Sequence, residues 1–183
     1  MKSFAAAAAV ATLALAATSA SAGVVSSGLS SGSYSQSSAW AGNTAQQAFN
    51  GNAWNAGGFG THWIQVDLGA VFDLGNLSFV INQAPAGNSW HSVYVDDSSI
   101  GANFGSLTAV ASRSGSTAAG DVISLDFTAT GRYVTIVANG GPSWTALSNV
   151  KVSTQDVPEP ASILLAAMGL GLAVVTGRRR AAA

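Results

Sequence analysis

The chain has 183 residues, a formal net charge of −1 and a charged fraction of only 8%. It contains no cysteine, which excludes a disulfide framework and a thiolate metal site. Between residues 23 and 156, seven aspartates face two arginines and one lysine. This acidic balance offers no basic footprint for a nucleic acid or an acidic lipid, so the sequence predicts no nucleic-acid partner.

The N-terminus, residues 1–22, has the pattern of a secretory signal peptide. Lys2 precedes an apolar run over residues 4–17, and a small-residue Ala-Ser-Ala sequence follows it. The run is too short for a membrane span. We therefore expect a signal helix that is removed by cleavage between Ala22 and Gly23.

The central part of the chain has the pattern of a β-sandwich. Residues 23–38 are rich in Ser and Gly and predict a flexible lead-in with room for one short strand. In the clearest strand, Ile64, Val66 and Leu68 alternate with polar residues. Similar runs, separated by turn residues, recur at 77–82, 91–97, 107–112, 121–128, 132–138 and 147–153. Residues 39–154 are therefore predicted to form an all-β antiparallel sandwich of seven or eight short strands.

Two segments between the predicted strands combine tight-turn residues with one tryptophan each. Trp90 lies in the first and Trp144 in the second, and these rings either recognise a ligand at the surface or pack against the domain. His91 could donate a hydrogen bond to a sugar hydroxyl, or it could cap its own loop. Arg113 is a candidate polar partner for a ligand. These four residues are our predicted carbohydrate-binding set.

The remaining tryptophans and Arg132 are expected to be structural. Trp63 begins a strand and Trp54 follows a turn, so we predict that both pack in the core. Trp40 has no assigned role. Arg132 is expected to pair with an aspartate at a strand edge.

The C-terminus has the pattern of a membrane anchor. Residues 155–160 form a linker that contains Val157, Pro158, Glu159 and Pro160. The apolar residues 161–177 predict a short transmembrane helix, and the Arg-rich tail 178–183 is expected to stay in the cytoplasm. A buried C-terminal helix is the alternative, although the run is apolar on all sides.

This tail closely resembles the PEP-CTERM sorting signal of Gram-negative bacteria in the order of its Pro-Glu-Pro motif, apolar helix and basic end. The resemblance implies recognition and cleavage by an exosortase-type sorting protease. It also implies export through the inner membrane, transient anchoring by the C-terminal helix, and final placement at the cell surface or in the extracellular matrix. Proteins with this signal typically accompany exopolysaccharide production, which points to a biofilm matrix.

The central part resembles the discoidin, or coagulation-factor C-type, domains of the galactose-binding-like fold. The matching pieces fall in family order at AFNGN (48–52), WIQVDLG (63–69), GRYVTI (131–136) and LSNVKV (147–152). The resemblance implies an eight-stranded antiparallel jelly-roll sandwich and a group that includes many carbohydrate-binding modules. It does not by itself specify a ligand.

The resemblance also raises the question of calcium. Many members hold a calcium ion beside an FDGN turn, but this chain has Asn50 in place of the Asp and Asn149 in place of a Glu in the last strand. Calcium prefers oxygen ligands that include carboxylates, so the site is weakened if it exists. We expect a hydrogen-bonded turn with an amide contact between Asn50 and Asn149; the alternative is weak calcium binding through the two amide oxygens.

The sequence lacks the patterns of common catalytic sites. Asp96 and Asp97 are adjacent, so on a strand they would point to opposite faces rather than across a cleft. Neither His62 nor His91 belongs to an HExxH motif, and no serine lies in G-x-S-x-G. We therefore predict a noncatalytic module that binds an extracellular glycan. The alternative is a structural matrix or protein-interaction domain without a sugar site.

Overall fold

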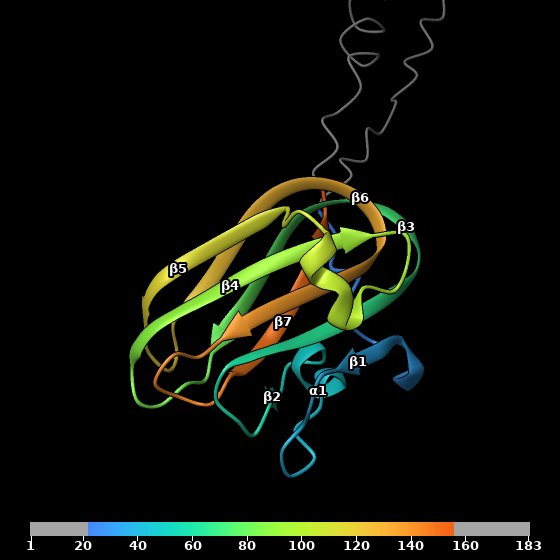
Figure 1. Cartoon of the computed structure of the whole chain (residues 1–183). Coiled ribbons are helices and arrows are strands. Elements are labelled where there is room, and N and C mark those ends of the chain that lie inside the picture. Colours follow the sequence, from blue (N-terminus) through green and yellow to red (C-terminus); the bar gives the residue numbers. More distant parts are fainter. Residues whose placement is uncertain (1–21, 156–183) are drawn as a thin grey trace, which may run out of the picture. The chain divides into compact units, whose positions relative to one another are not determined.

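Two long strands, β3 (Thr61–Ile81) and β6 (Val122–Asn139), form the frame of the fold (Figure 1). The computed structural model describes residues 22–155. The two strands pair antiparallel along most of their length, with a register shift between Asp67 and Phe72 of β3. Gly69 lies in this irregular part with φ of +81°, a backbone angle that glycine adopts without steric cost. Because the long strands bend, each contributes to both layers of the sandwich.

The shorter strands pair with one half or the other of the long pair. One layer holds the start of β3, the end of β6, and the strands β1, β4 and β5; the other holds the end of β3, the start of β6, and β7 and β2. All these pairings are antiparallel. The bounds of the shorter strands are β1 Tyr34–Gln36, β2 Ala53–Asn55, β4 Gly87–Asp96, β5 Ala111–Thr117 and β7 Ala146–Thr154. The structure is therefore the expected all-β antiparallel sandwich.

The described residues contain seven strands, which agrees with the seven or eight predicted from the sequence pattern and is one fewer than the resemblance implied. The predicted runs 63–68 and 77–82 are parts of β3, and the runs 121–128 and 132–138 are parts of β6. In the predicted run 107–112, only the last two residues are strand, because β5 begins at Ala111. The described residues contain seven strands because pairing continues through the bends.

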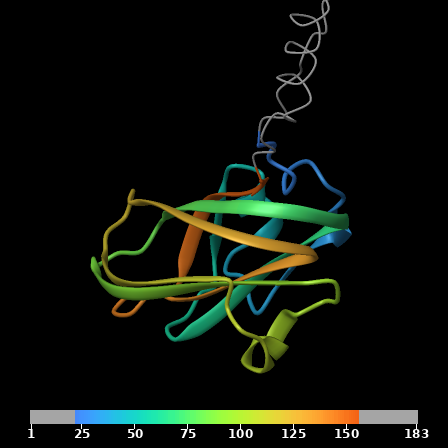
Figure 2. The same ribbon diagram turned by 90° about the horizontal axis from the view of Figure 1, so that it is seen from above.

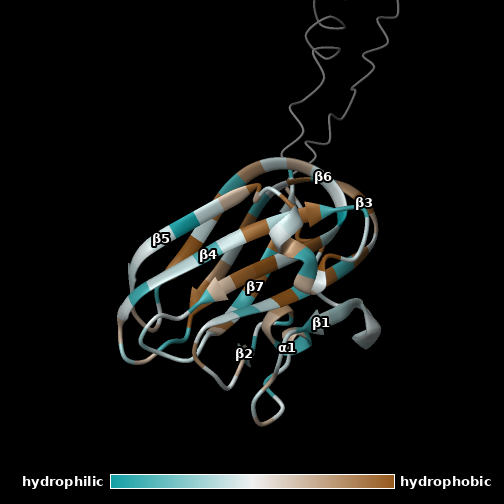
Figure 3. Ribbon diagram, viewed as in Figure 1, coloured by the Kyte–Doolittle hydropathy of each residue, from teal (hydrophilic) through white to brown (hydrophobic). Residues whose placement is uncertain are grey.

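Hydrophobic and polar residues alternate along the strands (Figure 3). The buried hydrophobic side chains form one core cluster. Trp54 is fully buried and its indole nitrogen donates to the carbonyl of Ser38 at 2.8 Å, as predicted for a core residue. The core prediction for Trp63 is wrong. Its ring is half-buried beneath the 3₁₀ helix η2 (Gly101–Ser106), which lies outside the sandwich (Figure 2).

The predicted flexible lead-in, residues 23–38, is instead part of the sandwich. Val24 bridges Ser153 of β7, and the backbone N–H of Val25 donates to the carbonyl of Val152 at 2.9 Å. The buried hydroxyl of Ser26 accepts from the N–H of Val152. Two short helices complete the fold, η1 (Ser31–Ser33) and α1 (Ala45–Phe49). Serine and glycine content alone did not reveal these contacts with the last strand.

The predicted signal helix, sorting motif and transmembrane helix fall on residues outside the described range. Within residues 22–155, none of the helices has the length and apolar character needed to cross a membrane.

Candidate ligand-binding cleft

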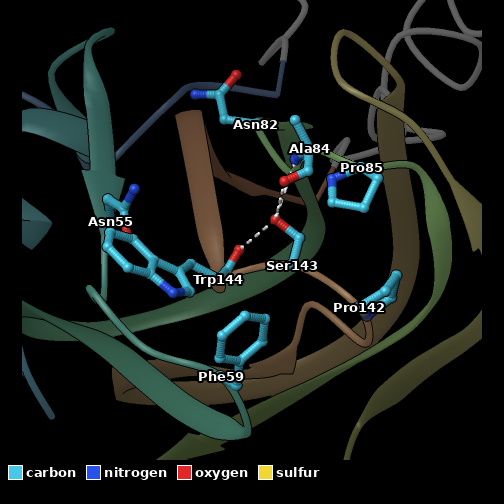
Figure 4. A pocket seen from close by; sticks show the side chains of 8 residues that line it. All are labelled: Asn55, Phe59, Asn82, Ala84, Pro85, Pro142, Ser143 and Trp144. Carbon is cyan, nitrogen blue, oxygen red and sulfur yellow. Dashed lines mark hydrogen bonds between the residues drawn. The ribbon is translucent and has the colours of Figure 1, made fainter.

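A cleft of about 350 Å³ opens at the end of the sandwich where three loops meet (Figure 4). The loops connect β2 to β3, β3 to β4, and β6 to β7. The residues that line the cleft are Asn55, Phe59, Asn82, Ala84, Pro85, Pro142, Ser143 and Trp144. Trp144 is thus one predicted site residue that lies in this cleft.

Trp144 lies between two buried residues, Ser143 and Thr145. Each of them forms hydrogen bonds with one neighbouring loop. The hydroxyl of Ser143 accepts from the N–H of Ala84 and lies 3.0 Å from the carbonyl oxygen of Ala84 (Figure 4). The backbone N–H of Thr145 donates to the carbonyl of Gly58 at 3.2 Å, and its hydroxyl donates to the carbonyl of Gly60 at 3.1 Å. The three loops are therefore joined on either side of the Trp144 ring, which stays partly exposed.

Three aromatic side chains gather at this end of the molecule. Trp144 is 37% exposed, Phe59 is 66% exposed and Trp40 is 51% exposed. The rings of Trp40 and Trp144 have centroids 5.7 Å apart and meet edge to face, with 63° between their planes. Gly57, at φ of +75°, allows Trp40 to pack closely, since a Cβ there would lie 2.7 Å from the Cβ of Trp40. The sequence reasoning missed Phe59 and left Trp40 without a role.

The signal for Phe59 was present in the sequence as an aromatic residue inside the glycine run GGFG. Its loop is held from below by His62, whose Nε2 lies 3.2 Å from the carbonyl oxygen of Phe59. The other ring nitrogen, Nδ1, lies 3.2 Å from the hydroxyl of Ser38. In the tautomer with a proton on Nε2, His62 donates to the carbonyl of Phe59, which fixes the backbone that carries this ring.

The polar lining of the cleft consists of amides and a hydroxyl. Asn55 accepts from the N–H of Gly57 at 2.8 Å, which leaves its amide NH₂ group available. The exposed side-chain amide of Asn82 has no hydrogen-bond partner among residues 22–155. These groups can donate to and accept from ligand hydroxyls.

The other predicted sugar-binding residues lie elsewhere, because their segment is a strand rather than a loop. Trp90 and His91 belong to β4, where successive side chains point to opposite faces. Trp90 is half-buried on the outer face, whereas His91 is 1% exposed and packs against Phe79 with ring centroids 5.0 Å apart. The loop placement of these two residues was wrong, and His91 has no surface to offer a ligand.

Arg113 is the cross-strand partner of His91 on β5. Its Nη2 donates to the carbonyl of Ser116 at 3.3 Å, and its Nη1 is buried without a partner in the described part of the chain. Burial, together with the positive charge of Arg113, lowers the pKa of His91 to about 4. The structure thus brings His91 and Arg113 together, and neither lines the cleft that contains Trp144. Arg132 pairs with Asp67 at 2.6 Å, as predicted.

The residues around Asn50 and Asn149 do not fit a calcium ion. Both line a hollow whose other lining residues are Val24, Ser27, Phe49, Gly51 and Lys151. This set contains no carboxylate, and the Lys151 ammonium would repel a divalent cation. The side-chain oxygen of Asn50 already accepts from the N–H of Gly28 at 2.9 Å. The predicted amide contact is also wrong: among the described hydrogen bonds, Asn149 is tied through its backbone N–H to the carbonyl of Asn52.

Comparison with known families identifies the domain. The family model of the F5/8 type C domain matches residues 26–151. The chain belongs to the F5/8 type C family. This match confirms the discoidin-like resemblance seen in the sequence. The fold of the family is that of a noncatalytic binding module. A second model, the PEP-CTERM protein-sorting motif, matches residues 156–180, a range that contains the predicted Val157 to Pro160. The motif implies a secreted, surface-sorted protein and an exosortase substrate.

Solved structures of carbohydrate-binding modules share the fold of this F5/8 type C chain. Chitosan-binding module 1 of the chitosanase/glucanase from Paenibacillus sp. IK-5 is 23% identical, with a TM-score of 0.54 over 71% of this chain and 98% of the module. A fucose-binding module from Streptococcus pneumoniae is 18% identical, with a TM-score of 0.51 over 73% and 98% of the two chains. At these identities the likeness shows the fold alone. No curated protein sequence matches the chain.

Proposed function

We propose that this protein is a noncatalytic carbohydrate-binding module and that the cleft around Trp144 holds an extracellular glycan. The observation that carries the proposal is the grouping of exposed Phe59, Trp144 and Trp40 beside free amide groups on loops that are tied together. A monomeric protein rarely exposes such a group of large rings without a binding role.

The geometry suits a sugar because sugars combine apolar C–H faces with hydroxyls. Aromatic rings supply rigid stacking surface at little entropic cost, and the amides of Asn55 and Asn82 supply hydrogen bonds. The rings of Trp144 and Phe59 stay partly exposed to solvent, so we expect weak, shape-based binding. The fold neighbour that binds fucose supports this ligand class.

We further propose where the module acts. The sequence pattern at residues 1–22 supports export through the inner membrane of a Gram-negative bacterium. The PEP-CTERM motif supports transient anchoring by the predicted C-terminal helix, processing by an exosortase-type enzyme, and final placement at the cell surface or in a polysaccharide matrix.

Truncation of the cleft aromatics tests the function. Trp144→Ala and Phe59→Ala each remove stacking area, and we expect each to weaken glycan binding by about tenfold or more, since burial of a large apolar side chain is worth roughly 1.5–3 kcal/mol. Binding is measured by titration calorimetry with oligosaccharides chosen from a glycan-array screen. Val71→Ala is the matched control, because Val71 is also an exposed apolar residue but lies at the bend of β3. Equal binding by all three variants would contradict the proposed site.

The second candidate is a structural or protein-interaction domain without a sugar site. Trp90 favours it, since this ring is only half-buried on the outer face of the layer that contains β4. If the domain acts in this way, Trp90→Ala disrupts assembly with matrix proteins while every glycan in the screen is ignored. Glycan binding that survives Trp90→Ala and is lost in Trp144→Ala favours the first candidate.

A further inference from the structure

No charged side chain lines the cleft. Its polar side chains are the two amides of Asn55 and Asn82 and the hydroxyl of Ser143, and its remaining lining residues are aromatic, proline or alanine. Amides and hydroxyls recognise other neutral polar groups by hydrogen bonds but cannot neutralise an ion.

The cations of the described domain are committed elsewhere. Arg132 is bonded to Asp67 through both its Nε and Nη2 atoms. Arg113 pairs with His91 across β5 and β4, and its Nη2 donates to the carbonyl of Ser116. Lys151 lines the separate hollow at Asn50. None of these three is a lining residue of the cleft, so a ligand carboxylate would find no cationic partner there.

The carboxylates are likewise outside the cleft. Asp73 accepts from the hydroxyl of Thr130, and Asp126 accepts from the amide of Asn76. Asp121 and Asp96 accept from backbone N–H groups close to them in the chain. A ligand ammonium in the cleft would therefore find no anionic partner.

We propose that the cleft selects uncharged glycans and discriminates against uronic acids and free amino sugars. The inference rests on the proposed function, because it names the ligand class of the same cleft. An ionised group that enters between Trp144, Phe59 and the two prolines loses part of its hydration and gains no opposite charge. The excess of aspartates over basic residues in the domain adds a further repulsion for polyuronates.

Two pairs of oligosaccharides test the proposal with the full chain. Mannotriose and trimannuronate differ by oxidation at C6, and N-acetylchitotriose and chitotriose differ by the acetyl group that masks each amine. Each titration is run with the wild type and with Trp144→Ala, at physiological salt and at a pH where the chitotriose amines are protonated. For each ligand, the quantity compared is the part of the binding affinity that is lost in the Trp144→Ala variant. We expect the neutral member of at least one pair to bind about tenfold or more tightly than its charged partner.

The outcomes separate the two proposals. Trp144-dependent binding that is equal or tighter for the charged members overturns neutral selection and leaves the glycan site standing. Absence of Trp144-dependent binding for all four ligands, and for every glycan in the array screen, overturns the glycan site and the selection together.

A gain-of-function variant gives an independent readout. Asn82→Asp places a carboxylate on the lining at nearly constant shape, and its side chain has no hydrogen bond to lose within residues 22–155. We expect this variant to bind chitotriose at least several-fold more tightly than the wild type does, in a salt-sensitive manner. Unchanged chitotriose binding by a folded Asn82→Asp protein counts against the assignment of charge selection to this lining.

Discussion

The buried imidazole of His91 makes stability dependent on pH in a defined window. Its pKa is lowered from 6.5 to about 4, first because burial disfavours the charged ring and second because Arg113 is nearby. The unfolded chain therefore binds more protons than the folded one between these values, so stability is present above pH 6.5 and is lost as the pH falls toward 4. The loss approaches about 3 kcal/mol, because each pKa unit corresponds to about 1.4 kcal/mol.

Denaturant titration from pH 7 to pH 4 measures this loss, with His91→Gln as the comparison. We expect a clearly flatter pH dependence in the variant, since glutamine does not titrate. The Asp67 pKa is lowered to about 2 by its hydrogen bond to Arg132, so its contribution is lost only at more acidic pH. Parallel pH profiles for the wild type and His91→Gln would contradict the role assigned to His91.

From the side chains that line the hollow at Asn50 and Asn149, we predict that calcium does not stabilise the domain. A divalent cation in their hollow would meet the Lys151 ammonium and no carboxylate, so we expect millimolar calcium to leave the melting temperature unchanged. Differential scanning calorimetry with calcium and then with a chelator measures this. A rise that the chelator reverses would show that amide and carbonyl oxygens suffice.

Individual site residues were predictable only where the local sequence determined their surroundings. Trp144 follows two glycines and a proline, which end β6 and keep the ring in a loop. Trp90 follows a similar Gly-Asn-Ser sequence, yet this segment pairs with β5 and β6 and becomes strand. Since those partners lie 20 or more residues away in the chain, local turn chemistry could not show that His91 points inward.

Among the elements, η2 depends on one buried amide. The Oε1 of Gln65 on β3 accepts from the N–H groups of Ile100 and Gly101 at 2.8 Å, and its Nε2 donates to the hydroxyl of Ser99 at 3.0 Å. Gln65→Leu would leave these buried donors without a partner, and we expect a loss of about 3 kcal/mol in the free energy of unfolding. Gln47→Leu is the control, because Gln47 is exposed on α1.

Chemical denaturation gives the stability change, and hydrogen exchange at residues 99–106 locates it. Faster exchange confined to this segment in Gln65→Leu, with Gln47→Leu unchanged, is the expected pattern. A Gln65→Leu protein as stable as the wild type would show that η2 is held mainly by Trp63 and by the contact of Tyr94 with Phe104.

Strand β3 shows which features the alternation of hydrophobic and polar residues can predict and which it cannot. The period of two in residues 63–68 correctly gave the inward set Ile64, Val66 and Leu68. The alternation could not show that β3 continues beyond Gly69. A glycine can mark either the end of a strand or a bend within it, and the local sequence is the same in both cases. Continuation depends on the pairing of Phe72 with Gly131, a contact between distant parts of the chain.

In the folded domain, the cleft and the last described residue lie at opposite ends of β7 (Figure 1). The strand has nine residues, so at about 3.3 Å per residue the two ends are separated by roughly 25–30 Å. This exceeds the Debye length of about 8 Å at physiological salt, so a charge at the far end of β7 is screened from the cleft.

We therefore expect glycan binding to be independent of the sorting tail. A chain that ends at residue 155 should bind the same oligosaccharide as the full chain within about twofold, because the cleft loops are tied to one another through Ser143 and Thr145 and not to the end of β7. Calorimetric titration of both proteins with one ligand measures this, and Trp144→Ala in each background confirms that the same cleft is observed. A change of tenfold or more on removal of residues 156–183 would show that the tail contributes to the ligand site, and the module would then bind differently before and after processing.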